Sequence, residues 1–432
     1  MADAIIVSAP SSGSGKTLIT LGLLRALKNT GLRVSAVKIG PDYIDPRFLE
    51  AATGRPCLNI DLWAMRPSLI TALLAAQEEE TDLLVIEGVM GLFDGPEKGK
   101  GSTADVAKDL GMPVLLVVDA SHQSQSIAAL VHGFSTFRKG VNVAGVILNR
   151  VGSERHRGLL AAALPQGLVV GAVPRLTGLE IPSRHLGLQQ AQELKGLEVL
   201  ITQAAEVAGS VIDLGKVKAL AKPLKLQPTL PKFLPPLGQR IAVANDAAFG
   251  FSYEHILASW RAQGAELRFF SPIADKPPLP DADAVFLPGG YPELHAARLA
   301  ANSRFLDGLS HAAARGALIY GECGGYMVLG RYLIDAKGKS HPMAALLPHA
   351  TSFAARTLSL GYRRLKHKSA LPFPAKLRGH EFHYSTLAEH VRGDHLFTMH
   401  DASGALIGPA GLRNGRIMGS YAHVIDREDS SL

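Results

Sequence analysis

The feature that most constrains the fold is a loop of small residues near the N-terminus, between an aliphatic segment and an amphipathic one. Residues 4–9 are typical of a short buried strand, the loop is Ala9-Pro-Ser-Ser-Gly-Ser-Gly-Lys-Thr17, and a helical pattern covers residues 18–29. Small residues let successive backbone N–H groups close around phosphate oxygens, and the N-terminus of the next helix adds a positive dipole end. Pro10 stands where the usual G-x-x-x-x-G-K-T pattern has its first glycine, and Ala9 takes that role one position earlier. The strand–loop–helix context still predicts a nucleotide site in a parallel α/β sheet.

Polar residues of the loop and of neighbouring strand ends are the candidate ligands. We expect Lys16 to reach the β- and γ-phosphates and the Thr17 hydroxyl to bind Mg²⁺. Glu87 ends an aliphatic run at the edge where ligands bind in open α/β sheets, so it is a second candidate for the metal. Asp42 and Asp45 follow the strand that carries Lys38, and they could meet metal or substrate or simply form a turn. Asn149 ends another strand, where it could contact adenine or cap a loop.

Both halves of the chain alternate short aliphatic strands with amphipathic helices, which predicts two α/β domains with mainly parallel sheets. In the first half we expect strands at residues 4–9, 33–39, 83–87, 113–118 and 143–149, with helices at 18–29 and 104–110. Residues 221–237 hold five prolines and no hydrophobic period, which predicts a stiff linker. Beyond the linker we expect strands at residues 240–244, 267–271, 284–288, 317–321 and 416–421. The expected division is a first domain at 1–220, a linker at 221–238 and a second domain at 239–432.

Composition narrows the class of protein. The 432 residues are 47% hydrophobic and 19% charged, enough for two or three cores and unlike collagen or a disordered tail. Two cysteines cannot make a disulfide framework, so we expect a reducing, cytoplasmic location. No apolar run approaches the about 18–20 residues that span a bilayer, and the first residues lack the basic start of a signal peptide. The net charge of +7 is scattered along the chain, which a polyanionic small substrate or a merely basic surface explains better than nucleic acid.

A second motif predicts a nucleophile. The run from Ala317 to Leu329 reads as a strand, then Gly321-Glu-Cys323-Gly-Gly325, then a helix, which is a nucleophile elbow with sulfur in place of oxygen. The tight turn would expose the thiol, the helix N-terminus would lower its pKa, and the Gly324 N–H would enter an oxyanion hole. A second N–H would come from the Gly289-Gly290 turn, and His423, expected at the end of a strand, is the candidate base.

Two other features are expected to carry no such chemistry. Cys57, in Gly54-Arg-Pro-Cys57, has no comparable surroundings and is expected to be structural. His380-Glu-Phe-His383 has the spacing H-E-x-H rather than H-E-x-x-H, so it lacks the two histidines one helical turn apart that bind zinc. We expect a substrate-side or structural role for this stretch.

A phosphate loop and a cysteine nucleophile in one chain are joined most simply by amide synthesis. A carboxylate becomes electrophilic when it is phosphorylated to an acyl phosphate, and a cysteine that splits glutamine through a thioester can supply unprotonated ammonia.

At this point the motifs together resemble the cobyrinic and hydrogenobyrinic acid a,c-diamide synthases of cobalamin biosynthesis, over essentially the whole chain. The first half is similar to the dethiobiotin-synthetase type of phosphate-loop fold, and the second to class I glutamine amidotransferase domains. The segments that carry the resemblance are residues 9–24, 38–46, 87–95, 184–185, 187–188, 242–251, 288–293, 321–325 and 419–423.

The resemblance implies a carbon–nitrogen ligase that uses ATP, Mg²⁺ and glutamine to amidate the a- and c-acetate carboxylates of a corrinoid polycarboxylate, with c first. It implies Cys323 as nucleophile, His423 as base, and Gly290 and Gly324 as oxyanion hole. The other implied ligands are Ser12, Gly13, Ser14, Gly15, Lys16, Thr17 and Asn149 for ATP, Thr17, Glu87 and Asp45 for Mg²⁺, and Asp42, Tyr43, Asp94 and His185 on the substrate side. The amino-acid sequence of residues 9–17 and 54–57 resembles that of the enzymes that act on the cobalt-free substrate. A homodimer is also compatible with the resemblance.

One position departs from the class I pattern. These glutaminases usually carry Glu two residues after the histidine, where this chain has Ile425. We therefore expect a Cys–His dyad, with Asp426 or another acid as the open choice for orienting His423. A weaker orienting group predicts slow glutamine hydrolysis without the other substrates, and brisk uncoupled release of glutamate would contradict it.

Two alternatives remain at this stage. One is a cobyric acid synthase type of enzyme, which amidates other corrin carboxylates with a similar pair of domains. The other is a ParA/MinD-like regulatory ATPase fused to an inert domain, but those proteins have an extra lysine early in the loop, where this chain has Ser11.

Overall fold

The computed structural model describes residues 2–176, 178–179, 181–184, 187–227, 229–388 and 392–429. They form two compact units. One comprises Met1–Trp63 and Pro67–Pro231, and the other comprises Ala64–Arg66 and Lys232–Leu432. A three-residue piece of the N-terminal half thus belongs to the second unit, which nothing in the sequence pattern indicates.

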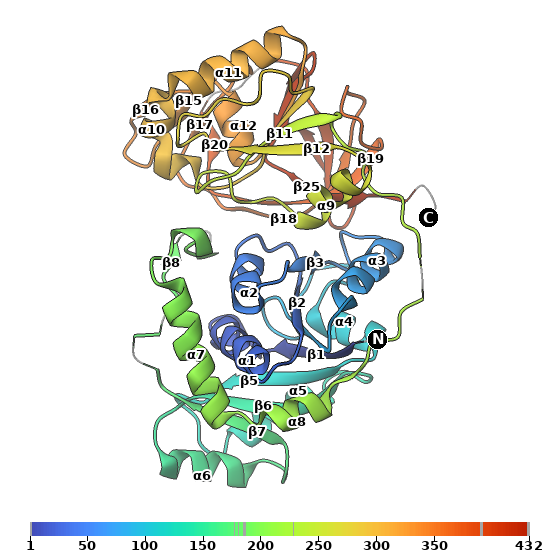
Figure 1. Cartoon of the computed structure of the whole chain (residues 1–432), viewed down its shortest axis with the longest axis vertical. Helices are drawn as coiled ribbons and strands as arrows, with labels where there is room; N and C mark the ends of the chain where they lie inside the picture. The colour runs from blue at the N-terminus through green and yellow to red at the C-terminus, as the bar shows by residue number, and fades with distance from the viewer. Residues whose placement is uncertain are drawn as a thin grey trace. The chain divides into compact units, whose positions relative to one another are not determined.

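The first unit is built on a parallel sheet in the order β3-β2-β4-β1-β5-β6-β7, with the short β10 paired antiparallel to the start of β1 (Figure 1). Its strands are buried aliphatic runs, as expected for a sheet covered on both faces. The five strands predicted for this half are confirmed, and β3 and β7 are added. The strands are β1 Asp3–Ser8, β2 Val34–Ile39, β3 Leu58–Ile60, β4 Leu83–Glu87, β5 Pro113–Asp119, β6 Asn142–Val151, β7 Val169–Pro174 and β10 Lys222–Pro223, and the separate pair β8 Ser183–Arg184 and β9 Gly187–Leu188.

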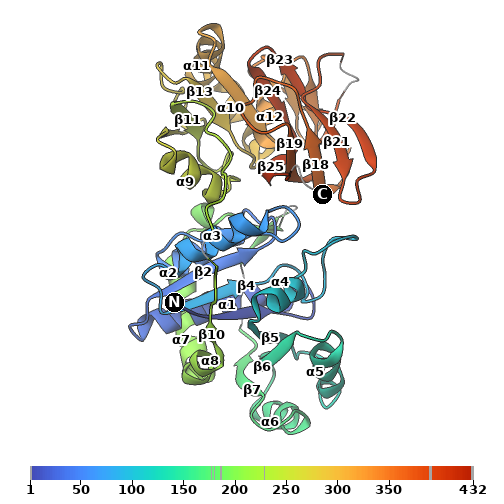
Figure 2. The ribbon, with the colours of Figure 1, turned by 90° about the vertical axis from the view of Figure 1, so that its right-hand side faces the viewer.

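Helices cover both faces of this sheet. In Figure 2, α7 and α8 lie on one side of it and α4, α5 and α6 on the other, and α1 packs against α7. The two predicted helices are confirmed as α1 and α4. The helices are α1 Lys16–Asn29, α2 Asp45–Thr53, α3 Pro67–Glu78, α4 Thr103–Leu110, α5 Ile127–Thr136, α6 Glu154–Ala163, α7 Leu197–Val211 and α8 Leu214–Leu220, with the 3-10 turn η1 Ala191–Glu193.

The second unit has a sheet in the order β12-β11-β13-β14-β24-β23, parallel except for β23. The five strands predicted for this half are confirmed to within two residues at each end. The elements of this layer are β11 Arg240–Ala244, β12 Glu266–Phe270, β13 Ala284–Leu287, β14 Leu318–Glu322, β23 Leu412–Asn414, β24 Ile417–Ser420, α9 Glu254–Ala262, α10 Ala296–Ala301, α11 Ser303–Ala314, α12 Gly324–Leu329 and the 3-10 turn η2 Pro292–His295.

The second unit also contains two sheets that the sequence did not predict. One is a five-stranded antiparallel sheet in the order β22-β21-β18-β19-β25, and the other is a small sheet in the order β16-β15-β17-β20. Their strands mix polar with apolar residues, so they lack the aliphatic runs of the parallel sheet. They are β15 Tyr332–Ile334, β16 Ser340–Pro342, β17 Ala350–Ser352, β18 Ser359–Lys366, β19 Lys376–His383, β20 Thr386–Leu387, β21 Phe397–Asp401, β22 Leu406–Ala410 and β25 His423–Arg427.

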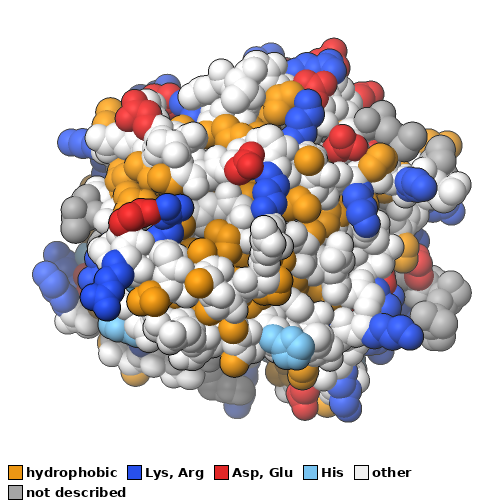
Figure 3. Space-filling model, turned by 90° about the horizontal axis from the view of Figure 1, so that it is seen from below, with side chains coloured by type: hydrophobic (Ala, Val, Ile, Leu, Met, Phe, Trp, Pro, Cys, Tyr) orange, Lys and Arg blue, Asp and Glu red, His pale blue; other side chains and the backbone are white. Residues whose placement is uncertain are grey.

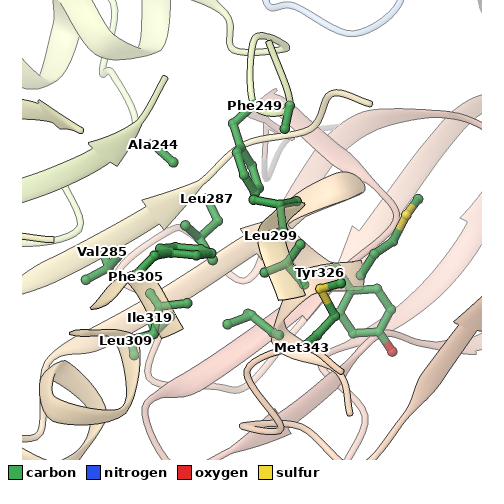
Figure 4. Close-up of a cluster of buried hydrophobic side chains, with 14 of the residues drawn as sticks. Ala244, Phe249, Val285, Leu287, Leu299, Phe305, Leu309, Ile319, Tyr326 and Met343 are labelled. Carbon is green, nitrogen blue, oxygen red and sulfur yellow. The ribbon is translucent and has the colours of Figure 1, made fainter. Parts of the chain in front are cut away.

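A hydrophobic cluster supports the turn between β14 and α12. It combines Leu287 and Ile319 from adjacent strands with Phe305 from α11 and Tyr326 from α12, all buried (Figure 4). Cys323 itself belongs to this cluster. The nucleophile predicted from the sequence is therefore held by the core of the second unit.

The face shown in Figure 3 has Lys and Arg side chains interspersed with Asp and Glu among neutral and hydrophobic ones. Within the described residues, no helix is long and apolar enough to cross a membrane.

Candidate active sites

The phosphate loop joins β1 to α1. Gly13 and Gly15 have φ angles of 82° and 83°, in the left-handed region that favours glycine, and α1 begins at Lys16. A Cβ on Gly15 would lie 2.3 Å from Nδ2 of Asn149, so no side chain fits there. The exposed Ser12 and the buried Ser14 flank Gly13. Six of the seven residues predicted to hold ATP are therefore consecutive, in the loop and the first turn of the helix that follows it.

Asn149 supports this loop from β6. Its Nδ2 donates to the Ser14 carbonyl at 2.8 Å, and its Oδ1 accepts from the Arg150 N–H at 2.9 Å. The structure thus brings Asn149 to the nucleotide loop, where it holds the backbone in place. Its contact with adenine stays a prediction.

A buried lysine gathers the carboxylates beside the loop. The Lys38 Nζ lies 2.5 Å from Asp45 Oδ2, 2.6 Å from Glu87 Oε1 and 3.6 Å from Asp42 Oδ2. Burial opposes the charge on Lys38, but Asp45, Glu87 and Asp42 together raise its pKa well above the usual value. Lys38 was not among the residues predicted from the sequence, although a lysine within the buried strand β2 was a usable signal.

Lys16 reaches the same cluster from the loop. Its ammonium group donates to the Gly88 carbonyl and lies 3.7 Å from Glu87 Oε1. Burial and the neighbouring Lys38 lower the pKa of Lys16, against the opposing effect of Glu87 and the other carboxylates. Two cations and the carboxylates around them form a polar centre suited to binding phosphate together with a metal ion.

The predicted magnesium ligands lie in this centre and fit the ion. The Thr17 hydroxyl is 3.4 Å from Asp45 Oδ2, and Oε2 of Glu87 is buried without a hydrogen-bond partner among the described residues. Hydroxyl and carboxylate oxygens are what Mg²⁺ prefers, with phosphates and water completing its shell. No group of three or more His, Cys, Asp or Glu in the described part of the chain could hold a metal by itself.

The four residues expected on the substrate side differ in their surroundings in the structure. Asp42 joins the Lys38 cluster, and its Oδ1 also accepts from the backbone N–H groups of Ile44 and Asp45 at 2.9 Å, at the start of α2. Tyr43 beside it is buried. Asp94 is exposed and accepts from the Gly91 N–H within its own loop, and His185 lies outside the described residues.

The nucleophile elbow is formed as the sequence predicts. Cys323 follows β14 directly and has φ 48° and ψ −104°, a conformation uncommon for a residue with a side chain and typical of strained functional turns. Its N–H donates to the Ser420 carbonyl on β24 at 2.8 Å. Gly325 permits the turn, since a Cβ there would lie 1.9 Å from the Leu287 carbonyl oxygen.

The two glycines of the predicted oxyanion hole meet beside the cysteine. A Cβ on Gly324 would lie 3.1 Å from the Gly290 nitrogen, and a Cβ on Gly290 would lie 2.1 Å from the Ala248 carbonyl oxygen. Neither position has room for a side chain. The structure therefore brings both backbone segments together, and their joint role as an oxyanion hole stays a prediction.

The cysteine and histidine meet at Gly289. A Cβ on Gly289 would lie 3.2 Å from the Cys323 Cβ, 2.9 Å from Nε2 of His423 and 2.3 Å from its Cε1. His423 is 1% exposed. It begins β25 instead of ending a strand, because the chain leaves β24 at Ser420 and joins the antiparallel sheet. His423 thus stands where the chain passes from the six-stranded sheet to the five-stranded sheet of the second unit.

The protonation states differ from the sequence-based expectation. Burial, and next the charge of Glu293, raise the pKa of the Cys323 thiol, although the Gly324 N–H acts in the opposite direction. Burial, with His380 and His383, lowers the pKa of His423 to about 3. The net shift of the thiol pKa is upward, opposite in direction to the expected lowering by a helix N-terminus, because burial is its largest cause. Both shifts favour the neutral thiol and the neutral imidazole.

The H-E-x-H stretch lies beside this pair. His380 on β19 is the register partner of His423 on β25, and the His383 ring stacks on Tyr421 at 3.9 Å. Glu381 accepts from Arg363 at 2.7 Å, and both side chains are nearly buried. Only the antiparallel sheet creates this proximity.

Gly289→Ala tests the geometry at this point. The added methyl group would collide with the imidazole, and we expect glutamine-dependent activity to fall at least about 100-fold. Ammonia-dependent activity should persist, because the phosphate loop is untouched. Gly133→Ala is the matched control, since a Cβ there meets nothing within 4 Å. Undiminished use of glutamine by Gly289→Ala would contradict the placement of the pair.

The comparisons with known proteins agree with this pair of sites. Residues 5–188 match the CobQ/CobB/MinD/ParA nucleotide binding domain, and residues 240–430 match the CobB/CobQ-like glutamine amidotransferase domain. The hydrogenobyrinate a,c-diamide synthase of Brucella abortus biovar 1 (strain 9-941) is 55% identical over 98% of both chains. That of Rhizobium meliloti (strain 1021) is 51% identical over 98% of this chain and 99% of its own. This chain belongs to the family of the hydrogenobyrinate a,c-diamide synthases.

Proposed function

We propose that this protein is a glutamine- and ATP-dependent amide ligase that converts the a- and c-acetate carboxylates of hydrogenobyrinic acid into amides, a step of cobalamin biosynthesis. The observation that carries the proposal is the pairing of two complete sites in one chain, a phosphate loop with its Lys–carboxylate cluster and a buried Cys–His elbow. The names of the full-length relatives supply the substrate.

Each unit is assigned one half-reaction. Residues 1–220 activate the acid, residues 239–432 hydrolyse glutamine, and residues 221–238 connect them. We place the two reactions in a reducing, cytoplasmic environment on the evidence of two free, buried cysteines.

In the first unit, the substrate carboxylate attacks the γ-phosphorus of ATP, the bond to the β,γ-bridging oxygen breaks, and ADP leaves. Lys16 and the N–H groups of residues 12–17 hold the phosphates while negative charge moves to the leaving oxygen. Thr17, Glu87 and Asp45 would hold Mg²⁺, which would supply positive charge to the phosphate oxygens. Ammonia then attacks the acyl phosphate carbon, phosphate leaves, and the amide remains.

In the second unit, His423 takes the Cys323 proton as sulfur attacks the carboxamide carbon of glutamine. Gly290 and Gly324 stabilise the resulting oxyanion through their N–H groups. His423 returns the proton to the nitrogen, and ammonia leaves. Water, deprotonated by the same histidine, hydrolyses the thioester and releases glutamate.

Mass spectrometry tests the proposal directly. Hydrogenobyrinic acid and cobyrinic acid are incubated separately with protein, ATP, Mg²⁺ and glutamine. Each amidation replaces OH by NH₂, so we expect the metal-free acid to lose twice that mass difference, while the cobalt form changes little. Equal conversion of the cobalt form would overturn the preference for the metal-free substrate. If neither acid changes in mass, the proposed reaction is wrong. The same assay would then be applied to the substrates of a cobyric acid synthase type of enzyme.

A further inference from the structure

His423 has an acidic neighbour at the second nitrogen of its ring. A Cβ on Gly289 would lie 2.9 Å from its Nε2 and 3.2 Å from the Cys323 Cβ, while its Nδ1 is 3.7 Å from Oε2 of Glu322. The two side chains are 1% and 5% exposed. Glu322 directly precedes Cys323, so a single turn carries both the nucleophile and this acid.

The acid that follows the histidine in sequence is used elsewhere. Asp426 Oδ2 accepts from the Arg66 backbone N–H at 3.0 Å and from its Nε at 2.9 Å, and Oδ1 accepts from Nη2 at 3.0 Å. On β25, Asp426 is the register partner of Arg378, whereas His423 is the register partner of His380. Ile425 stands on the strand where class I glutaminases usually place their acid. Asp426, left open by the sequence, is therefore an anchor for Arg66.

Glu322 is held so that only one of its oxygens faces the imidazole. Its Oε1 accepts from the Val424 N–H at 3.0 Å and from the Tyr320 hydroxyl at 2.9 Å. Val424 follows His423, so the same contact ties the carboxylate to the strand that carries the base. The carboxylate cannot rotate away without breaking both hydrogen bonds.

We propose that Glu322 is the positioning residue for His423. From the strand before the nucleophile, it fills the role that other class I glutaminases give to a glutamate two residues after the histidine. The inference rests on the proposed function, since it concerns the glutamine half-reaction. A carboxylate facing Nδ1 favours the tautomer with its proton on Nδ1, which leaves the Nε2 lone pair free to take the Cys323 proton. The same carboxylate then stabilises the imidazolium.

The charges around the pair make this role dependent on pH. Burial raises the pKa of Glu322 to about 8, against the hydrogen bonds from Val424 and Tyr320. Around it, burial lowers the pKa of His380 to about 3 and also lowers that of His383, and the thiol pKa of Cys323 is raised. Glu293 and Glu381 complete the charged groups near the sulfur. Glutaminase activity should therefore rise with pH as Glu322 ionises, near pH 8.

Glu322→Gln is the test. The amide oxygen can keep the contacts to Val424 and Tyr320, while the amide NH₂ faces Nδ1 and imposes the opposite tautomer. We expect kcat for glutamine hydrolysis to fall on the order of 10²–10⁴-fold with little change in KM, and the rise near pH 8 to disappear. Ammonia-dependent amidation should remain, and Glu322→Asp should recover part of the lost kcat.

Asp426→Asn is the matched control, because it also removes one buried carboxylate. We expect it to lower the melting temperature through Arg66 while glutamine- and ammonia-dependent rates keep their ratio. Wild-type kcat in Glu322→Gln, or a selective loss of glutamine use in Asp426→Asn alone, would overturn the inference.

Nitrogen NMR of the unmodified protein labelled with ¹⁵N-histidine decides the matter if Glu322→Gln fails to fold. His423 should carry its proton on Nδ1 at a pH above the Glu322 transition, and a proton on Nε2 would overturn the inference. Glutamate release is measured without corrinoid, so a failure of the proposed amidation is distinguishable from a failure of this inference.

Discussion

Cys323→Ala is expected to lower glutamine-dependent amidation by about 10⁴-fold or more, while amidation with ammonium salts stays close to wild type. The thiol is the only group in the elbow that can form a thioester. Without it, Gly290, Gly324 and His423 have no thiol to deprotonate and no covalent intermediate to stabilise. The phosphate loop belongs to the other compact unit and should work with ammonia from solution. Parallel rate measurements with glutamine and with ammonium chloride check this expectation.

Cys57→Ala is the matched control for that variant. Cys57 is also buried, and burial raises its thiol pKa well above the usual value, but it lies in the first unit, away from any elbow. We expect Cys57→Ala to use both nitrogen sources normally. Loss of both activities in Cys323→Ala would refute a scheme with separate sites for ammonia production and acid activation.

Lys16→Ala should remove amidation from either nitrogen source, with a loss of at least about 10²–10³-fold. Lys16 lies at the first position of α1 and within 3.7 Å of Glu87, so it is the cation placed to follow the γ-phosphoryl group. Without it, Lys38 remains, but three carboxylates already surround that ammonium group. ADP release and amide formation, both measured with saturating ammonia, report the effect.

Lys100→Ala controls for the loss of a positive charge. Lys100 is exposed and pairs with Asp109 on the surface, an interaction that contributes little to stability. We expect its activity to match wild type. Unchanged amidation by Lys16→Ala would remove the phosphate loop from the mechanism and reopen the assignment of the first unit.

Much of the fold was determined by local sequence alone. The aliphatic strands of both parallel sheets, the phosphate loop and the Gly-x-Cys-Gly-Gly elbow lie where their patterns predict. Buried parallel strands require continuous aliphatic residues, and tight turns at ligand sites require small ones, so these features leave a signal within a few neighbouring residues.

Other parts of the sites were decided by tertiary structure. In the sequence, nothing distinguishes Glu322 from any other residue next to a cysteine. Lys38 is a charged residue within a predicted strand, and the H-E-x-H stretch lacks the spacing of a zinc motif. Each acquires its role from partners far along the chain: His423 for Glu322, Glu87 for Lys38 and β25 for His380. The pKa shifts of Cys323 and His423 have the same origin, because desolvation depends on everything packed around a group. Sequence patterns record the local requirements of the backbone, whereas charge and burial at a site are sums over residues that only the folded chain brings together.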